Sequence, residues 1–107
     1  SIIGDVDGRN VVIIDDMVDT AGTLVLAAKM IKDRGATSIR AFATHPILSG
    51  NAIERINDSA IEELVVSDSV PFINYSKKIK VLSIAEIFAR TIQAVNSNQS
   101  ISTNFVF

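Results

Sequence analysis

Two adjacent carboxylates and a short hydroxyl-rich segment are the residues of this chain that best fit a ligand-binding site. Asp15 and Asp16 directly follow the apolar run 11–14, and residues 19–23 read Asp-Thr-Ala-Gly-Thr. Carboxylates accept hydrogen bonds from hydroxyl groups and are ligands that Mg²⁺ prefers. Free amides at the start of a helix, helped by threonine hydroxyls, hold a phosphate dianion without a lysine.

The spacing predicts two neighbouring subsites that together fit ribose 5-phosphate. The phosphate would lie on a cradle at a helix start, and like charges would keep it away from the carboxylate pair, which suits a sugar diol or Mg²⁺. The predicted site residues are Asp15, Asp16, Asp19, Thr20, Ala21, Gly22 and Thr23. The alternatives are solvated surface or turn chemistry for Asp15 and Asp16, and a plain N-cap for Asp19 or Thr20. A P-loop is excluded because the glycine and lysine spacing of that motif is missing.

The elements that must position these residues alternate between strand and helix. A continuous β-branched run predicts a strand over residues 10–14, covered on both faces. Apolar residues at helical spacing predict a helix over 22–34, with Gly35 as its stop. Further strands are predicted at 38–44, 63–67 and 79–82, a short helix at 49–57, and a helix behind a capping box that starts at Ser83.

This order predicts an α/β fold: a mainly parallel sheet with helices on both faces, similar to a Rossmann domain. In such sheets, ligands bind beyond the carboxyl ends of the strands, which is where the aspartates are expected. We expect residues 1–107 to form a single domain, with residues 96–107 as a polar tail. The chain starts at Ser1 in a strand-like stretch, so we expect it to be a piece of a longer protein.

Composition removes several classes of function. A net charge of −2 at pH 7 argues against non-specific nucleic-acid binding, because that binding needs an excess of basic residues. The absence of cysteine excludes disulfides and thiolate metal sites. The apolar runs are too short to span a membrane, and a cytoplasmic protein is expected. His45 is the single histidine, and we expect it to shape the turn before Pro46 instead of acting as an acid or base.

The stretch V-V-I-I-D-D-M-V-D-T-A-G-T resembles the phosphoribosyl-diphosphate signature of type I phosphoribosyltransferase-fold proteins. More narrowly, the chain is similar to the C-terminal domain of the ribose-phosphate pyrophosphokinase (phosphoribosyl-diphosphate synthetase) family. Three other segments support this narrower resemblance: Gly4-Asp5-Val6 with Gly8-Arg9, the segment Thr-His-Pro-Ile-Leu-Ser-Gly at 44–50, and Gln-Ser-Ile-Ser at 99–102 with Phe105.

The resemblance implies transfer of the diphosphoryl group of ATP to the C1 hydroxyl of ribose 5-phosphate, which gives phosphoribosyl diphosphate and AMP. It implies that Asp15 and Asp16 hold the ribose hydroxyls directly or through Mg²⁺, and that residues 19–23 hold the 5-phosphate. The catalytic loop, ATP pocket and metal ligands of this family precede the matched region. No catalytic residue is therefore expected within this chain, which should be inactive alone. A hexamer-like homo-oligomer is implied for the parent protein, and Ser100, Ser102 and Phe105 fall where the family places an allosteric phosphate or ADP site.

Three other functions remain open from the sequence. A phosphoribosyltransferase would share the cradle but needs a segment that recognises a base. A catalytically silent relative that senses phosphoribosyl diphosphate would also share the cradle, since binding does not imply chemistry. A phospho-acceptor receiver domain also ends its first strand in an acidic pair, with Asp68 as the candidate acceptor, but it would leave residues 20–23 unexplained.

Overall fold

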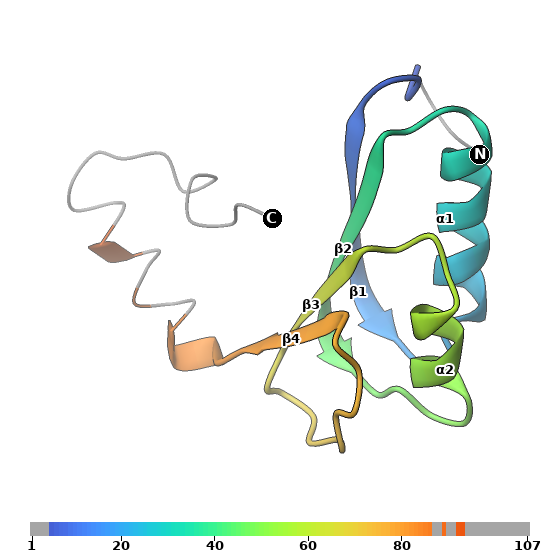
Figure 1. Cartoon of the computed structure of the whole chain (residues 1–107). Coiled ribbons are helices and arrows are strands. Elements are labelled where there is room, and N and C mark those ends of the chain that lie inside the picture. Colours follow the sequence, from blue (N-terminus) through green and yellow to red (C-terminus); the bar gives the residue numbers. More distant parts are fainter. Residues whose placement is uncertain (1–4, 87–88, 90–91, 94–107) are drawn as a thin grey trace.

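The computed structural model describes residues 5–86, 89, 92 and 93 (Figure 1). They contain four strands and two helices, in the order β1 (Asn10–Val18), α1 (Gly22–Asp33), β2 (Ser38–Pro46), α2 (Ala52–Asn57), β3 (Glu63–Ser67) and β4 (Ile79–Leu82). Residues 84–86, 89, 92 and 93 are also helical. Within this described part, no helix combines the length and the apolar character that crossing a membrane requires.

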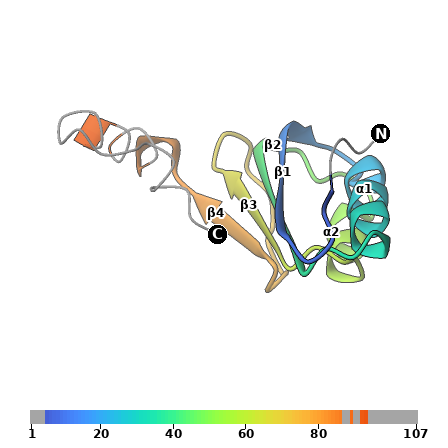
Figure 2. The same ribbon diagram turned by 90° about the horizontal axis from the view of Figure 1, so that it is seen from above.

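The four strands form one parallel sheet whose order, β1-β2-β3-β4, follows the chain without a reversal. Both helices lie on the same face of this sheet (Figures 1 and 2). Crossovers of one hand between strands that advance in one direction place their helices on one face, which explains this arrangement. The predicted parallel α/β fold is confirmed. Neither α1 nor α2 provides the expected second helical layer, and the helix predicted after Ser83 falls largely outside the described residues.

Strand β1 is open on the face away from the helices, although we expected it to be covered on both faces. Val12 and Ile14 are 45% and 78% exposed, and they pair with Arg40 and Phe42 of β2. Successive strand residues point to opposite faces. Val11 and Ile13 therefore point towards α1 and pack against the core, whereas Val12 and Ile14 point away from it. One sheet face is thus uncovered along β1 in the described part of the chain.

The core lies between the sheet and the two helices. On β2 the alternating residues Ile39, Ala41 and Ala43 are almost fully buried, as the side-chain period of a strand requires. The predicted apolar stripe of α1 is confirmed, with Leu24, Ala28 and Ile31 buried and Ala27 half-buried, and α2 buries Ala52, Ile53 and Ile56. This packing fixes the start of α1 against the carboxyl end of the sheet.

Several predicted boundaries are confirmed and others are wrong. Strands β3 and β4 have the predicted bounds, and α1 begins at the predicted Gly22. Strand β1 continues to Val18, four residues beyond its predicted end, so Asp15 and Asp16 lie within the strand and not after it. Strand β2 extends to Pro46, and α2 starts at Ala52 instead of Ser49.

The predicted signals at the helix ends are present. Gly35 has φ 98°, and its N–H donates to the carbonyl of Lys32 at 3.0 Å, as expected for a glycine that ends a helix. The hydroxyl of Ser83 accepts a hydrogen bond from the N–H of Glu86 at 3.0 Å, which is the serine half of the predicted capping box.

A hydrogen bond attaches the loop between β3 and β4 to helix α2. The phenol of Tyr75 donates to Oε1 of Glu54. This bond lowers the pKa of Glu54, with a smaller contribution from the backbone of Glu54, and it raises the pKa of Tyr75. Because the pKa of Glu54 is lowered, the contact stabilises the fold fully at pH values above 4.5, the ordinary carboxyl pKa, and this stabilisation is lost as the pH falls through the lowered pKa. Because the pKa of Tyr75 is raised, the stabilisation is fully present below pH 10.0, the ordinary phenol pKa, and is lost as the pH rises through the raised pKa.

Tyr75→Phe should therefore raise the pKa of Glu54 towards its ordinary value, because the carboxylate loses the donor that stabilises its charged form. NMR titration of the side-chain carboxyl carbon measures this directly. An unchanged Glu54 titration would show that the contact does not form in solution.

Candidate functional site

A hollow of about 270 Å³ lies where β1 passes into α1. Its lining includes Asp15 of the strand and all five predicted cradle residues, 19–23, together with Met17, Val18 and Leu24. The structure thus brings one aspartate of the acidic pair together with the hydroxyl-rich loop. This loop is a short turn at the carboxyl end of β1, the end at which parallel sheets bind their ligands.

The start of α1 has amides that the protein itself leaves free. The residue before the helix is Ala21, in the left-handed conformation with φ 66°, and no side chain caps the helix. The first helical hydrogen bond runs from the N–H of Val25 to the carbonyl of Ala21 at 3.0 Å. The amides of residues 22–24 precede that bond and have no partner within the helix. Neither Asp19 nor Thr20 is the N-cap, so the capping alternative is wrong for both.

The acidic pair is divided between the two faces of β1. Asp15 and Asp16 are successive strand residues, so their side chains leave the strand on opposite sides. The Oδ1 atom of Asp15 accepts the N–H of Asp16 at 2.8 Å. The carboxylate of Asp16 is 88% exposed, does not line the hollow, and lies 3.9 Å from Nε2 of His45.

His45 lies beside the site without forming a catalytic hydrogen-bond chain. Its Nδ1 is 2.9 Å from the hydroxyl of Ser69, and its Nε2 is too far from Asp16 for a hydrogen bond. The residue is the last but one of β2, which ends at the buried Pro46, so the position where a turn was expected belongs to the strand instead.

The loop after β2 is hydrogen-bonded to the end of β1 and to the first residue of the cradle. The N–H of Leu48 donates to the carbonyl of Val18 at 3.0 Å, and the N–H of Ser49 donates to the carbonyl of Asp19 at 2.9 Å. The hydroxyl of Ser49 also donates to the carboxylate of Asp19. Leu48 and Ser49 therefore support the cradle and the end of β1, and the Asp19 carboxylate is engaged by Ser49.

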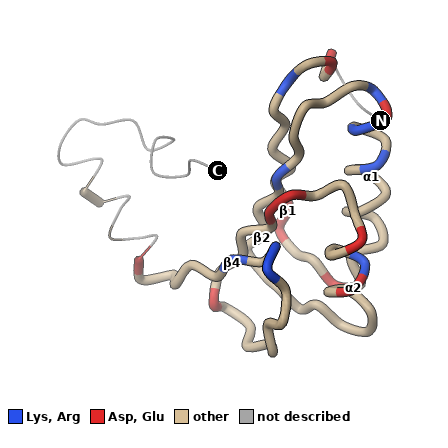
Figure 3. Tube along the Cα trace, in the orientation of Figure 1, with Lys and Arg blue, Asp and Glu red and all other residues tan. Residues whose placement is uncertain are grey.

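Charges of both signs are interspersed along the described trace (Figure 3). Among the described residues, no group of three His, Cys, Asp or Glu side chains is arranged to hold a metal ion. The predicted tail residues Ser100, Ser102 and Phe105 lie outside the described residues, so their allosteric role stays a prediction.

Comparison with known proteins identifies the family. The sequence pattern of the phosphoribosyl synthetase-associated domain matches residues 1–106. The chain belongs to this family. It is 49% identical over 106 residues to a ribose-phosphate pyrophosphokinase of Wolinella succinogenes, and 52% identical over 105 residues to one of Helicobacter hepaticus. These alignments cover 99% and 98% of the chain.

A solved structure supports the fold of this phosphoribosyl synthetase-associated domain. The crystal structure of phosphoribosylpyrophosphate synthetase from Mycobacterium smegmatis matches 90% of the chain with a TM-score of 0.76 and 36% sequence identity. The chain spans about a third of the length of these relatives: 34% of both pyrophosphokinases and 33% of the solved chain. The expectation that this third is the C-terminal one stays a prediction.

Family membership removes the receiver-domain alternative. Asp68, its candidate phospho-acceptor, instead accepts the N–H of Ile84 at 2.9 Å through Oδ1. That contact is a helix-start interaction like the one Ser83 makes, and it gives the Asp68 carboxylate a structural role.

Two residues of this phosphoribosyl synthetase-associated domain contact the cradle and were not among the predicted site residues. Ser49 contacts Asp19 as described, and Nη1 of Arg55 in α2 donates to the carbonyl of Thr20 at 2.9 Å. Ser49 lies in the segment that carried the family resemblance. Arg55 gave no local signal, because a basic residue in the last turn of a short helix is ordinary.

Proposed function

We propose that the chain forms the ribose 5-phosphate site of a ribose-phosphate diphosphokinase. The whole protein would transfer the diphosphoryl group of ATP to the C1 hydroxyl of ribose 5-phosphate, giving phosphoribosyl diphosphate and AMP. The observation that carries the proposal is the uncapped start of α1 opening into a hollow that also contains Asp15. Identities of 49% and 52% to ribose-phosphate pyrophosphokinases favour this activity over a phosphoribosyltransferase or a silent sensor.

The 5-phosphate would bind to residues 20–23. Free amides at the helix start point along the axis towards the anion, and the positive end of the helix dipole adds to the attraction. In the described part of the chain, the hydroxyls of Thr20 and Thr23 make no hydrogen bond to a protein group, so they are available to phosphate oxygens. Gly22 keeps the approach to these donors open.

The ribose hydroxyls would bind beside the phosphate, with Asp15 as the main acceptor. This carboxylate lines the same hollow as the cradle, whereas Asp16 leaves on the other face of β1. The geometry therefore favours unequal roles for the two aspartates, where the sequence suggested a shared one. Asp16 would reach the sugar only from the outer side of the strand.

Mg²⁺ does not fit as an ion held by the described protein residues alone. Asp15 and Asp16 are the predicted ligands, but they leave β1 on opposite faces and belong to no cluster of three ligating side chains within the described residues. Mg²⁺ commonly keeps several waters and is held largely by substrate oxygens.

The contribution of this chain to the reaction would be positioning. Phosphoryl transfer depends mainly on alignment of the reactants and on charge stabilisation. Anchoring the 5-phosphate and the diol would fix the C1 hydroxyl for attack on ATP, whose binding groups would come from the rest of the protein. A homo-oligomeric parent protein and a cytoplasmic location belong to the same proposal.

An amide-resolved NMR titration of the 107-residue chain tests the proposal. Ribose 5-phosphate should shift the amides of residues 15 and 19–23, and it should bind more tightly than inorganic phosphate because it engages both subsites. ATP serves as a control and should leave these amides largely unchanged. A well-dispersed spectrum that does not respond to ribose 5-phosphate would contradict the proposed function.

A further inference from the structure

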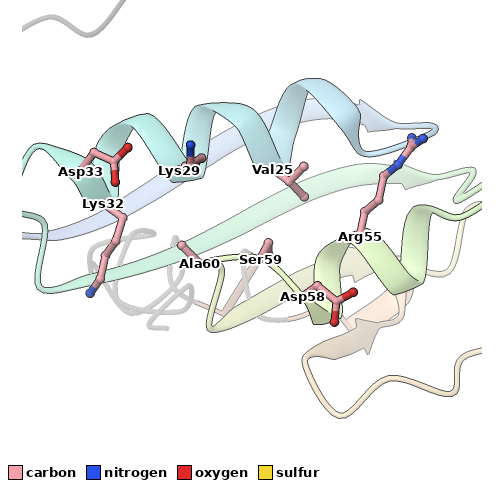
Figure 4. A pocket seen from close by; sticks show the side chains of 8 residues that line it. All are labelled: Val25, Lys29, Lys32, Asp33, Arg55, Asp58, Ser59 and Ala60. Atoms are coloured by element: carbon pink, nitrogen blue, oxygen red, sulfur yellow. The ribbon is translucent and has the colours of Figure 1, made fainter.

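Arg55 connects the outer face of the helical layer to the candidate phosphate cradle. It lines a groove of about 550 Å³ between α1 and α2, together with Lys29, Lys32 and Asp58 among others (Figure 4). Its side chain extends from α2 towards the end of β1 and the start of α1. There Nη1 donates to the carbonyl of Thr20 at 2.9 Å.

The guanidinium also borders the space in front of the helix start. A Cβ atom built on Gly22 would lie 3.8 Å from Nη1 of Arg55 and 3.8 Å from the hydroxyl oxygen of Thr20. Gly22 thus faces a small space bounded by a cation on one side and a hydroxyl on the other. The phosphate of the proposed function would occupy this space.

The charge of Arg55 matters because the cradle itself has no cation. Residues 18–24 include one ionisable side chain, the acidic Asp19, and Asp15 adds a second carboxylate to the hollow. Among the described residues, Arg55 is the basic residue with a hydrogen bond to this loop. A guanidinium has several N–H donors, so one can hold Thr20 while others remain for phosphate oxygens.

We propose that Arg55 is a positioning residue that holds the Thr20 carbonyl and places a positive charge beside the bound phosphate. The inference rests on the proposed function and deepens it, since it names the cation of a site that otherwise consists of amides and hydroxyls. Holding the carbonyl fixes the peptide that leads into Ala21, and thereby the direction of the free amides.

The test measures dissociation constants of ribose 5-phosphate for the whole chain by NMR, at low and at moderate ionic strength. Arg55→Gln should weaken binding about tenfold at low ionic strength, because a charge-assisted contact and its field are lost. Its affinity should also depend less on salt than that of the wild type. Arg55→Lys keeps the charge, so it should recover most of the lost affinity and the wild-type salt dependence.

Lys29→Gln is the matched control, because it removes one positive charge from the same groove without touching the cradle. Its dissociation constant should stay within about twofold of the wild type, as expected for a distant surface charge. The exposed position of Arg55 and the good helix propensity of glutamine favour normal folding of the variants, which amide dispersion checks.

Two results would overturn the inference. Binding of ribose 5-phosphate by Arg55→Gln as tight as by the wild type would show that Arg55 is irrelevant to the site. An equal loss of affinity in the Gln and Lys variants, with the salt dependence of the wild type retained in both, would assign Arg55 a purely structural role. Failure of the wild type to bind ribose 5-phosphate would instead contradict the proposed function itself.

Discussion

Gly22→Val should weaken the binding of both inorganic phosphate and ribose 5-phosphate by more than about a hundredfold while leaving the chain folded. A Cβ at this position would meet Arg55 and Thr20 at 3.8 Å, which is ordinary van der Waals contact. Gly22 also does not have a positive φ, so the backbone accepts an L side chain. The valine side chain would then occupy the space from which phosphate must approach the free amides of α1.

Dissociation constants from amide titrations, with a melting temperature for each protein, measure this effect. Gly22→Ala adds only the first carbon and should give an intermediate loss, which distinguishes gradual filling of the space from misfolding. A folded valine variant that binds phosphate within a few-fold of the wild type would place the anion elsewhere.

Asp15→Ala should weaken ribose 5-phosphate binding by about 10- to 100-fold, the range expected when hydrogen bonds to a charged acceptor are lost. Inorganic phosphate should bind about as before, because it lacks the diol that the carboxylate accepts. Asp16→Ala should cause a smaller loss, since its carboxylate is on the other face of β1 and outside the hollow.

The same titration with both ligands and both variants decides between the subsites. Equal weakening of inorganic phosphate and ribose 5-phosphate by Asp15→Ala would contradict the separation into a phosphate cradle and a diol subsite. Equal losses of ribose 5-phosphate in the two variants would show that both carboxylates reach the sugar, as the sequence alone suggested.

Local sequence signals predicted much of the fold because they act over a few residues. β-Branched and alternating runs gave Glu63–Ser67 and Ile79–Leu82 their observed bounds, and the apolar stripe with Gly35 behind it gave α1 its start and its end. The predicted end of β1 was wrong because aspartate has low strand propensity, which favoured ending the strand before Asp15. In the structure the pairing of β1 with β2 continues to Val18 and Pro46, so Asp15 and Asp16 lie within the strand.

The position of the helices shows the same limit at a larger scale. Alternation of strands and helices predicted a parallel sheet, which is confirmed, but it does not specify the order of the strands. The observed order has no reversal among the described strands, and this places α1 and α2 on one face. Strand order depends on which edges pair, and no periodic pattern in the sequence records that choice.

The candidate cradle could be predicted from the sequence because it is a contiguous loop of hydroxyls and glycine at the start of a helix, whose chemistry depends on residues next to one another. The tertiary structure decided which distant groups complete it. It placed Asp15 in the hollow and Asp16 outside it, and it brought Ser49 and Arg55 to the loop from 30 and 35 residues away. Such contacts depend on how strands pair and helices pack, so the spacing of residues along the chain carries no sign of them.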